Sequence, residues 1–198
     1  MAGKFKVKTN TKPVVDNTVS GNTLEEIWEA LRKKALACSD AVGMAVTDIK
    51  TPNVNTFTEE KAKKGPKKKG NEAWIVAGKP GEVLMTVTIT LPKLSSDKNL
   101  SKAAKKEWKR FRAAVSAHED LHVDVATKLA ETIAQELTDM RGHGEGKTKD
   151  AAIAAAVADY TKQYKKAYGG TKIAERVKKT HAALDSKGNT FTLDINID

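Results

Sequence analysis

The sequence WKRFRAAVSAHEDLHVDVA, residues 108–126, decides the fold that the chain is expected to adopt. Apolar residues and two histidines recur there at steps of three and four, which is the spacing of one face of an α-helix. The pattern continues in both directions and predicts one long helix over residues 99–140, with Gly142 as a stop signal. The expected inner face consists of Trp108, Phe111, Val115, His118, His122, Val125, Leu129, Ile133 and Leu137.

Two histidines of this face belong to the motif His118-Glu119-Asp120-Leu121-His122, or HExxH. Residues four apart project from the same side of a helix, so both imidazoles can reach one metal ion, and Glu119 stands beside the open coordination position. Zinc in such a site keeps three protein ligands and a water. Glu119 is the expected general base, which takes a proton from that water and passes it to the leaving amine. The motif therefore predicts one zinc ion per chain and hydrolysis of peptide bonds.

A second interpretation of the motif needs no metal. His118 and His122 can be core residues hydrogen-bonded to their neighbours, with Glu119 on a solvated flank of the helix. However, an unpaired histidine is costly to bury, so two of them on one inner face need a shared partner. A divalent zinc ion provides such a partner, and the complete motif in register with the helix favours the metal.

The third zinc ligand must come from another part of the chain. The residues after His122 lack the extension HExxHxxGxxH, which would supply it. His143 lies about 21 residues further on, roughly 30 Å along an unbroken helix. His181 lies near the end of a later helix that can fold back across the site, and it is the expected third ligand. A carboxylate stays open as the alternative third ligand. The carboxylates on the long helix itself are less suitable, because they face another side of the helix or lie too far along it; they are Asp124, Glu131 and Glu136.

Strands and one helix are expected before the long helix. Residues 14–20 read as a short strand, and Thr23 with Glu26 forms a capping box for an amphipathic helix. The segments that then favour strands are residues 41–57, with a loop, residues 73–76, and residues 83–91, which end at Pro92. If the strand over residues 83–91 lies at a sheet edge, it can bind a substrate peptide as an added strand. If it is interior, its alternation records only burial.

Helices and a final strand are expected after the long helix. A glycine-rich turn, RGHGEG, leads into helices over residues 148–168 and 171–183, and TFTLDINID at residues 190–198 reads as a closing strand. Strands, then helices, then a strand indicate an α+β fold rather than alternating α/β units. The expectation is one domain over residues 1–198, in which a small twisted sheet packs against the long helix and the helices after it.

The positive charge of the chain is concentrated in one block. The net charge is +10, and residues 61–112 hold 15 Lys and Arg against 4 acidic residues, or +11, so the remainder sums to −1. The densest part is a Lys-rich segment at residues 59–71, expected to be a flexible surface insertion because lysine, glycine and proline there cannot pack. Its lysines are Lys61, Lys63, Lys64, Lys67, Lys68 and Lys69. Nucleic-acid binding is not favoured, because no aromatic residues are interleaved for base stacking.

Several protein classes are excluded by composition. A single cysteine, Cys38, rules out a disulfide framework and a cysteine-rich zinc finger. No window approaches the run of about 20 apolar residues that a membrane helix requires. The start, MAGKFKVKTN, lacks the apolar centre of a signal peptide, so the chain is expected to be soluble and to carry no export signal.

The chain resembles a bacterial domain family described as predicted secreted zinc-dependent proteases, long catalogued as a domain of unknown function. The resemblance rests on TVSGNTLEEIWEAL, VTITLPKL and WKRFRAAVSAHEDLHVDVA, which are similar to the family's first turn and helix, its strand ending in Leu-Pro, and its HExxH helix. The family also has a late histidine in the pattern Tyr-Asp-x-x-Thr-x-His-Gly. His181 falls at that place, without the Tyr, Asp and Gly. The resemblance implies a zincin-like fold, a metallopeptidase activity and a secreted or periplasmic location.

The combined expectation is a zinc-dependent metallopeptidase acting on a peptide or protein, as an endopeptidase rather than an exopeptidase. His118, His122 and His181 hold the zinc, and Glu119 is catalytic. The alternative is a non-catalytic module, zinc-containing or metal-free, that binds an acidic partner or nucleic acid through its Lys-rich segment. The sequence defines no substrate-binding residue and no oligomeric state.

Overall fold

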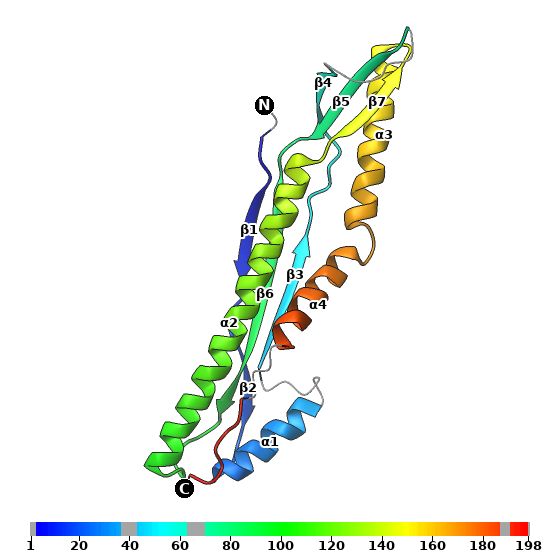
Figure 1. Ribbon diagram of the computed structural model, residues 1–198. Helices are drawn as coiled ribbons and strands as arrows, with labels where there is room; N and C mark the ends of the chain where they lie inside the picture. Colours follow the sequence, from blue (N-terminus) through cyan, green and yellow to red (C-terminus); the bar gives the residue numbers. More distant parts are fainter. Residues whose placement is uncertain (1–2, 37–42, 63–69, 187–190, 198) are drawn as a thin grey trace. The chain divides into compact units, whose positions relative to one another are not determined.

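The computed structural model describes residues 3–36, 43–62, 70–186 and 191–197, and within them it has an α+β fold (Figure 1). The elements follow in the order β1 (Lys6–Thr11), β2 (Val15–Val19), α1 (Leu24–Leu36), β3 (Met44–Lys50), β4 (Phe57–Lys61), β5 (Glu72–Gly78), β6 (Glu82–Leu94), α2 (Lys102–Asp139), β7 (Gly142–Gly146), α3 (Lys149–Tyr168) and α4 (Lys172–Asp185). The expected long helix is confirmed as α2, and the two expected helices after it are confirmed as α3 and α4. The strand β1 was not predicted, because its sequence KVKTNT has little apolar alternation.

Two compact units make up the described chain. The first contains Met1–Thr9, Asp48–Met85 and Thr127–Lys179, and the second contains Asn10–Thr47, Thr86–Ala126 and Thr180–Asp198. The longest elements, such as α2 and β6, contribute residues to both units. The single domain over residues 1–198 stays a prediction.

The four-stranded sheet is organised around β6, which pairs with β1, β2 and β3. β6 is thus an interior strand, so the proposal that residues 83–91 form a substrate-binding edge is wrong. The strand continues past Pro92 to Leu94, and β2 pairs with this last part in parallel, with Val15 opposite Thr90 and Val19 opposite Leu94. Proline lacks an N–H, but near the end of a strand this removes few of the hydrogen bonds between strands. This explains why β6 does not end at Pro92.

The second unit holds one apolar core between helices and sheet. Thr23 caps α1, since its hydroxyl accepts the Glu26 N–H at 3.2 Å and the Glu26 carboxylate accepts the Asn22 N–H at 2.7 Å. Trp28 of α1 meets Phe111 of α2 edge to face, with ring centroids 6.0 Å apart. The fully or almost fully buried side chains here are Leu24, Ile27, Leu31, Val87, Ile89, Leu91, Phe111 and Val115. The predicted alternation of β6 is confirmed in this core, and so is the part of the predicted inner face of α2 that includes Phe111 and Val115. Val125 and Leu129 of that face are only partly buried.

The first unit contains a smaller sheet, of order β4-β5-β7, which packs on α3. Residues 141–146 were predicted to be a turn, but Gly142–Gly146 form β7 instead, and this strand pairs antiparallel with β5. Glycine is required on its inner side because a Cβ at Gly142 would lie 2.0 Å from the Ala156 carbonyl oxygen, and one at Gly144 would lie 2.2 Å from that of Ala152. The glycines therefore allow the backbone of α3 to approach the strand closely.

The C-terminal residues 191–197 form no strand, so the predicted closing strand is wrong for the residues described. Their backbone is held by side chains of α2, as set out below.

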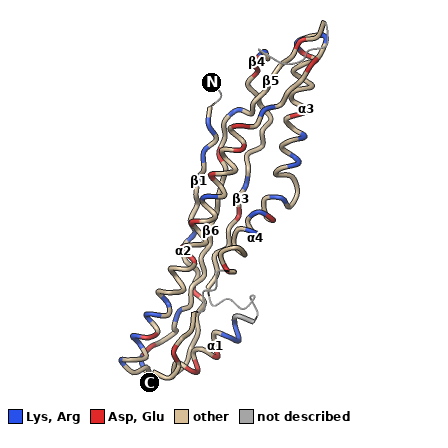
Figure 2. The backbone as a smooth tube through the Cα atoms, viewed as in Figure 1, with Lys and Arg blue, Asp and Glu red and all other residues tan. Residues whose placement is uncertain are grey.

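Basic residues of the charge block occupy the first turns of α2 (Figure 2). They are Lys102, Lys105, Lys106, Lys109, Arg110 and Arg112. The predicted flexible segment at residues 59–71 includes the end of β4 and stops just before β5, while its residues 63–69, and Cys38, lie outside the described residues. Among the described helices, none is long and apolar enough to cross a membrane.

Candidate metal centre

Two helices supply the side chains of the candidate metal centre in the second unit. α2 carries His118, Glu119 and His122, and the last turns of α4 carry His181 and Asp185. Each helix carries two residues of a type that binds metals, and the two are four apart in the sequence. They are His118 and His122 on α2, and His181 and Asp185 on α4. Each pair therefore lies on one face of its helix.

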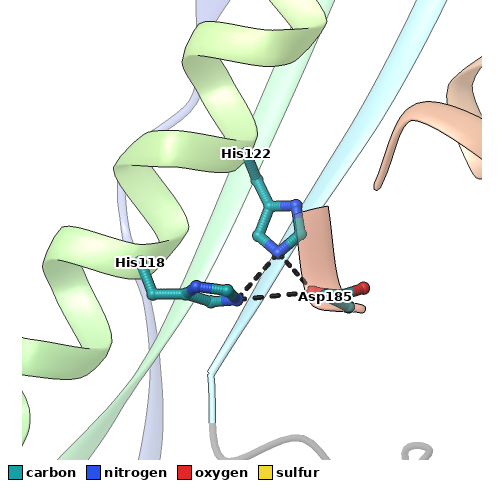
Figure 3. A group of neighbouring side chains, drawn as sticks. All are labelled: His118, His122 and Asp185. Carbon is teal, nitrogen blue, oxygen red and sulfur yellow. Dashed lines mark hydrogen bonds and ion pairs between the residues drawn. The ribbon is translucent and has the colours of Figure 1, made fainter. Parts of the chain in front are cut away.

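His118, His122 and Asp185 form a compact group, with one donor atom from each within 4.8 Å of the others (Figure 3). The Nε2 atoms of the two histidines are 3.0 Å apart. Oδ1 of Asp185 lies 3.4 Å from His118 Nε2 and 3.0 Å from His122 Nε2. Two imidazole nitrogens and a carboxylate oxygen are a donor set that zinc binds well.

The spacing of these donor atoms fits a zinc ion. Ligands about 2.0–2.1 Å from zinc in tetrahedral geometry lie roughly 3.3 Å from one another. The observed separations of 3.0, 3.0 and 3.4 Å are close to that value. The side chains of His118 and His122 are only 11% and 8% exposed, whereas that of Asp185 is 57% exposed. A bound ion would therefore be reached by solvent from the Asp185 side.

His181 contacts the other side of His122. The two Nδ1 atoms lie 2.7 Å apart, and the rings stack with centroids 4.8 Å apart. Nε2 of His181 is buried and has no hydrogen-bond partner among the described residues. Burial lowers the pKa of both His122 and His181, which favours the neutral imidazole that can bind a metal.

Glu119 is buried against the start of β3, and is not on a solvated flank. The Ala45 N–H donates to its carboxylate, and a Cβ added at Gly43 would lie 2.9 Å from its Oε1. Burial raises the pKa of Glu119 to about 7, despite the opposing hydrogen bond from Ala45. A carboxyl group with a pKa near 7 can both take up and release a proton at neutral pH.

The predicted site residues thus lie together in the second unit. However, His181 lies beside Nδ1 of His122, whereas Asp185 lies beside Nε2. Sequence reasoning missed Asp185, which is the third member of the group where His181 was expected. A signal was present, because the spacing His181-x-x-x-Asp185 repeats the four-residue spacing of the HExxH histidines. The predicted helix ended at residue 183, and so it left Asp185 outside. The carboxylates considered on α2 are not in this group.

Residues 14–169 match the model of a family described as "Bacterial protein of unknown function (DUF922)". The chain therefore belongs to this family of bacterial proteins. The matched region includes His118, Glu119 and His122 and ends before His181 and Asp185. No curated protein and no solved structure matches the chain.

Proposed function

We propose that the chain is a zinc-dependent peptidase whose metal is held by His118, His122 and Asp185. The observation that carries this proposal is the group of three donor atoms at zinc-like separations beside a buried carboxylate. If no zinc binds, a network of hydrogen bonds must account for the short distances among three atoms. Two imidazole Nε2 atoms and one carboxylate oxygen lie within 3.4 Å of one another. Each pair of these atoms can share at most one proton, whereas a single cation can bind all three atoms at once. A shared cation is therefore the simpler explanation of the cluster.

The tautomers required for metal binding agree with the surroundings of His122. When its Nε2 faces an ion, its proton is on Nδ1, which donates to Nδ1 of His181. His181 then carries its own proton on Nε2. Histidines that bind zinc usually donate their second N–H in this way, and the contact fixes the orientation of the ring. In this proposal His181 orients His122, while its predicted role as a zinc ligand stays the competing assignment.

Glu119 has the position and the protonation behaviour of a general base. It follows His118 directly on α2, and its carboxylate is held by the Ala45 N–H. A bound zinc ion would supply Lewis-acid chemistry by lowering the pKa of a water and polarising a peptide carbonyl. Glu119 accepts the proton from the water and then delivers it to the amine leaving group. The same carboxylate serves both steps because it is held in place by the Ala45 N–H.

The test compares two carboxylates of α2 after zinc loading. Glu119→Gln removes the proposed base, whereas Asp124→Asn changes an exposed carboxylate on the same helix and serves as the matched control. We expect both variants to bind one zinc ion per chain. Hydrolysis of a denatured protein substrate should fall at least 100-fold in Glu119→Gln and should change less than twofold in Asp124→Asn. Equal activity of Glu119→Gln and wild type would remove Glu119 from the mechanism.

A further inference from the structure

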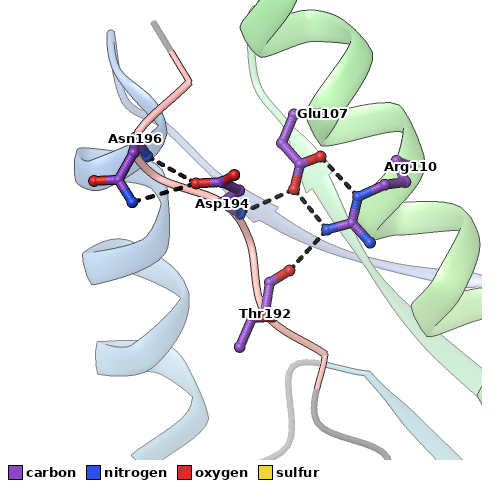
Figure 4. Close-up of polar contacts among 5 residues, drawn as sticks. All are labelled: Glu107, Arg110, Thr192, Asp194 and Asn196. Atoms are coloured by element: carbon purple, nitrogen blue, oxygen red, sulfur yellow. Dashed lines mark hydrogen bonds and ion pairs between the residues drawn. The ribbon is translucent and has the colours of Figure 1, made fainter.

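The C-terminal segment, residues 191–197, lies beside α2 in the second unit (Figure 4), and after Asp194 it turns, with the Asn196 N–H donating to Asp194 Oδ1 at 3.1 Å. Its burial alternates with a period of two, because Leu193 is buried while Thr192 and Asp194 are exposed. Phe191, Ile195 and Ile197 on the same side are partly covered. Such alternation belongs to a strand, although this segment forms no sheet in the described residues.

Two side chains of α2 take the place of a neighbouring strand. Arg110 Nη2 donates to the Thr192 carbonyl oxygen at 2.9 Å, and Glu107 Oε1 accepts the Asp194 N–H at 2.9 Å. The C=O of one residue and the N–H of the second residue after it point to the same side of an extended chain. Glu107 and Arg110 thus bind a backbone N–H and a backbone carbonyl oxygen, which a peptide without proline offers whatever its sequence.

Glu107 and Arg110 also bind each other directly. Arg110 donates to both carboxylate oxygens of Glu107, at 2.7 and 2.6 Å. The Arg110 guanidinium lowers the pKa of Glu107, although that carboxyl group is buried. A charged, bidentate pair is rigid, and rigid donors and acceptors suit recognition of a peptide backbone.

The segment also reaches the metal centre. The ring of Phe191 lies against the imidazole of His118, with centroids 5.0 Å apart and planes inclined by 60°. His118 is one of the three members of the metal-binding group. The same peptide therefore contacts the proposed zinc ligand at one end and the Glu107–Arg110 pair further along.

We propose that Glu107, Arg110 and His118 form a peptide site, named here the tail site, which residues 191–197 of the same chain occupy as an intramolecular blocking segment. The site would accept an extended peptide with apolar side chains at alternate positions once the tail is displaced. The blocking role rests on the proposed peptidase function, whereas the peptide binding does not. A tethered segment has an effective concentration of about 1 mM, so it excludes weak peptides in trans until it is released.

The binding test uses a fluorescein-labelled peptide, FTLDINID, which has the sequence of residues 191–198. We expect it to bind a chain that ends at residue 190, and to bind the full chain at least tenfold more weakly, because the tail competes. A peptide with aspartate in place of Leu193 should not bind. Arg110→Met in the shortened chain should weaken binding at least tenfold, because it removes the donor to the peptide carbonyl. Equal binding to the full and shortened chains, or no binding to a folded shortened chain, would overturn the tail site.

A full-length variant covers the case in which the shortened chain does not fold. Leu193→Asp places a charge at the buried position and should release the tail without removing it. This variant should bind the peptide as the shortened chain does. If neither variant folds, as judged by circular dichroism, the tail is an integral part of the core and the proposal is wrong.

Hydrolysis separates this inference from the proposed function. In the zinc-loaded protein, release of the tail should raise kcat/KM for a peptide substrate at least fivefold, and added FTLDINID should reverse the gain. Peptide binding without hydrolysis in any variant would sustain the tail site and refute the peptidase. Hydrolysis that neither release nor added peptide changes would sustain the peptidase and refute the blocking role.

Discussion

The Asp185 carboxylate lies 3.0 Å from Nε2 of His122 and brings the last turn of α4 to the HExxH motif of α2. A helix that carries two histidines four apart offers only two ligands, and such a pair does not complete a zinc site. The third ligand has to be supplied by tertiary structure. In this chain α4 brings two candidates to His122, with Asp185 beside Nε2 and His181 beside Nδ1.

Substitutions at these two positions should differ in their effect on zinc affinity. If Asp185 is the ligand and His181 orients His122, Asp185→Ala should weaken zinc binding more than 100-fold, and His181→Ala about 10-fold. Competition with a chromophoric chelator measures both values. Asp124→Ala, an exposed carboxylate on α2, is the control and should leave the affinity unchanged. The opposite order of the two effects would make His181 the ligand, as the sequence predicts.

Gly43→Ala should disturb the general base without disturbing the metal. The added Cβ would lie 2.5 Å from Val115 Cγ1 and 2.9 Å from Glu119 Oε1, so the Glu119 carboxylate has to move. Because a displacement of about 1 Å can reduce a rate 100-fold, we expect a loss of 10- to 100-fold in hydrolysis. The zinc content should stay at that of wild type. The control Asp48→Ala changes an exposed residue of β3 and should alter neither hydrolysis nor zinc content. Full activity of Gly43→Ala would show that Glu119 does not need its present position.

Periodicity along the chain was enough to predict the parts of the fold in which local pattern and burial agree. The spacing of Phe111, Val115 and His122 gave α2, and the alternation of β6 gave its buried side. The HExxH motif was found by the same reasoning, because both of its histidines fall on one helical face. These features depend on residues close in sequence, so they are visible before folding.

Other features depend on partners far away in the chain. The glycines of β7 read as a turn, but they recur every second residue because α3 covers one side of the strand. Residues 191–197 alternate like a strand, yet they bond to side chains of α2. Asp185 has the same four-residue spacing from His181 as the HExxH histidines have, but only the packing of α4 against α2 brings it to them. In each case the pattern is local, whereas the partner that decides its role is not encoded locally.

The contact between Glu136 and Arg176 predicts acid sensitivity in the first unit. Glu136 accepts hydrogen bonds from both terminal nitrogens of Arg176, at 2.8 and 2.9 Å, and from the Tyr168 hydroxyl at 2.9 Å. The Arg176 guanidinium lowers the pKa of Glu136 from its ordinary value of 4.5. The folded state then binds this proton more weakly than the unfolded state, so stabilisation is complete above pH 4.5 and is lost as the pH falls through the lower folded pKa.

Thermal melts across pH test this assignment. Glu136→Gln should lower Tm by a few degrees at pH 7, and the difference from wild type should shrink toward zero near pH 3. The effect is modest because the pair is partly solvated. Glu131→Gln, which changes an exposed carboxylate on the same helix, should leave the pH dependence of wild type intact. A Tm difference for Glu136→Gln that is constant from pH 3 to pH 7 would contradict the role of the charge.

Gly144→Ala tests the close approach of β7 and α3. The added Cβ would lie 2.2 Å from both the Ala152 carbonyl oxygen and the Ala156 nitrogen, and these backbone atoms cannot rotate away as the end of a side chain can. The helix has to shift off the strand and loosen the core around Ala156 and Tyr160, so we expect a loss of about 2–3 kcal/mol in the free energy of unfolding. Urea denaturation measures it, with Glu145→Ala, an exposed neighbour in β7, as a control expected to change it by less than about 0.5 kcal/mol. If the two variants unfold at the same urea concentration, the glycine is not required by the packing of α3.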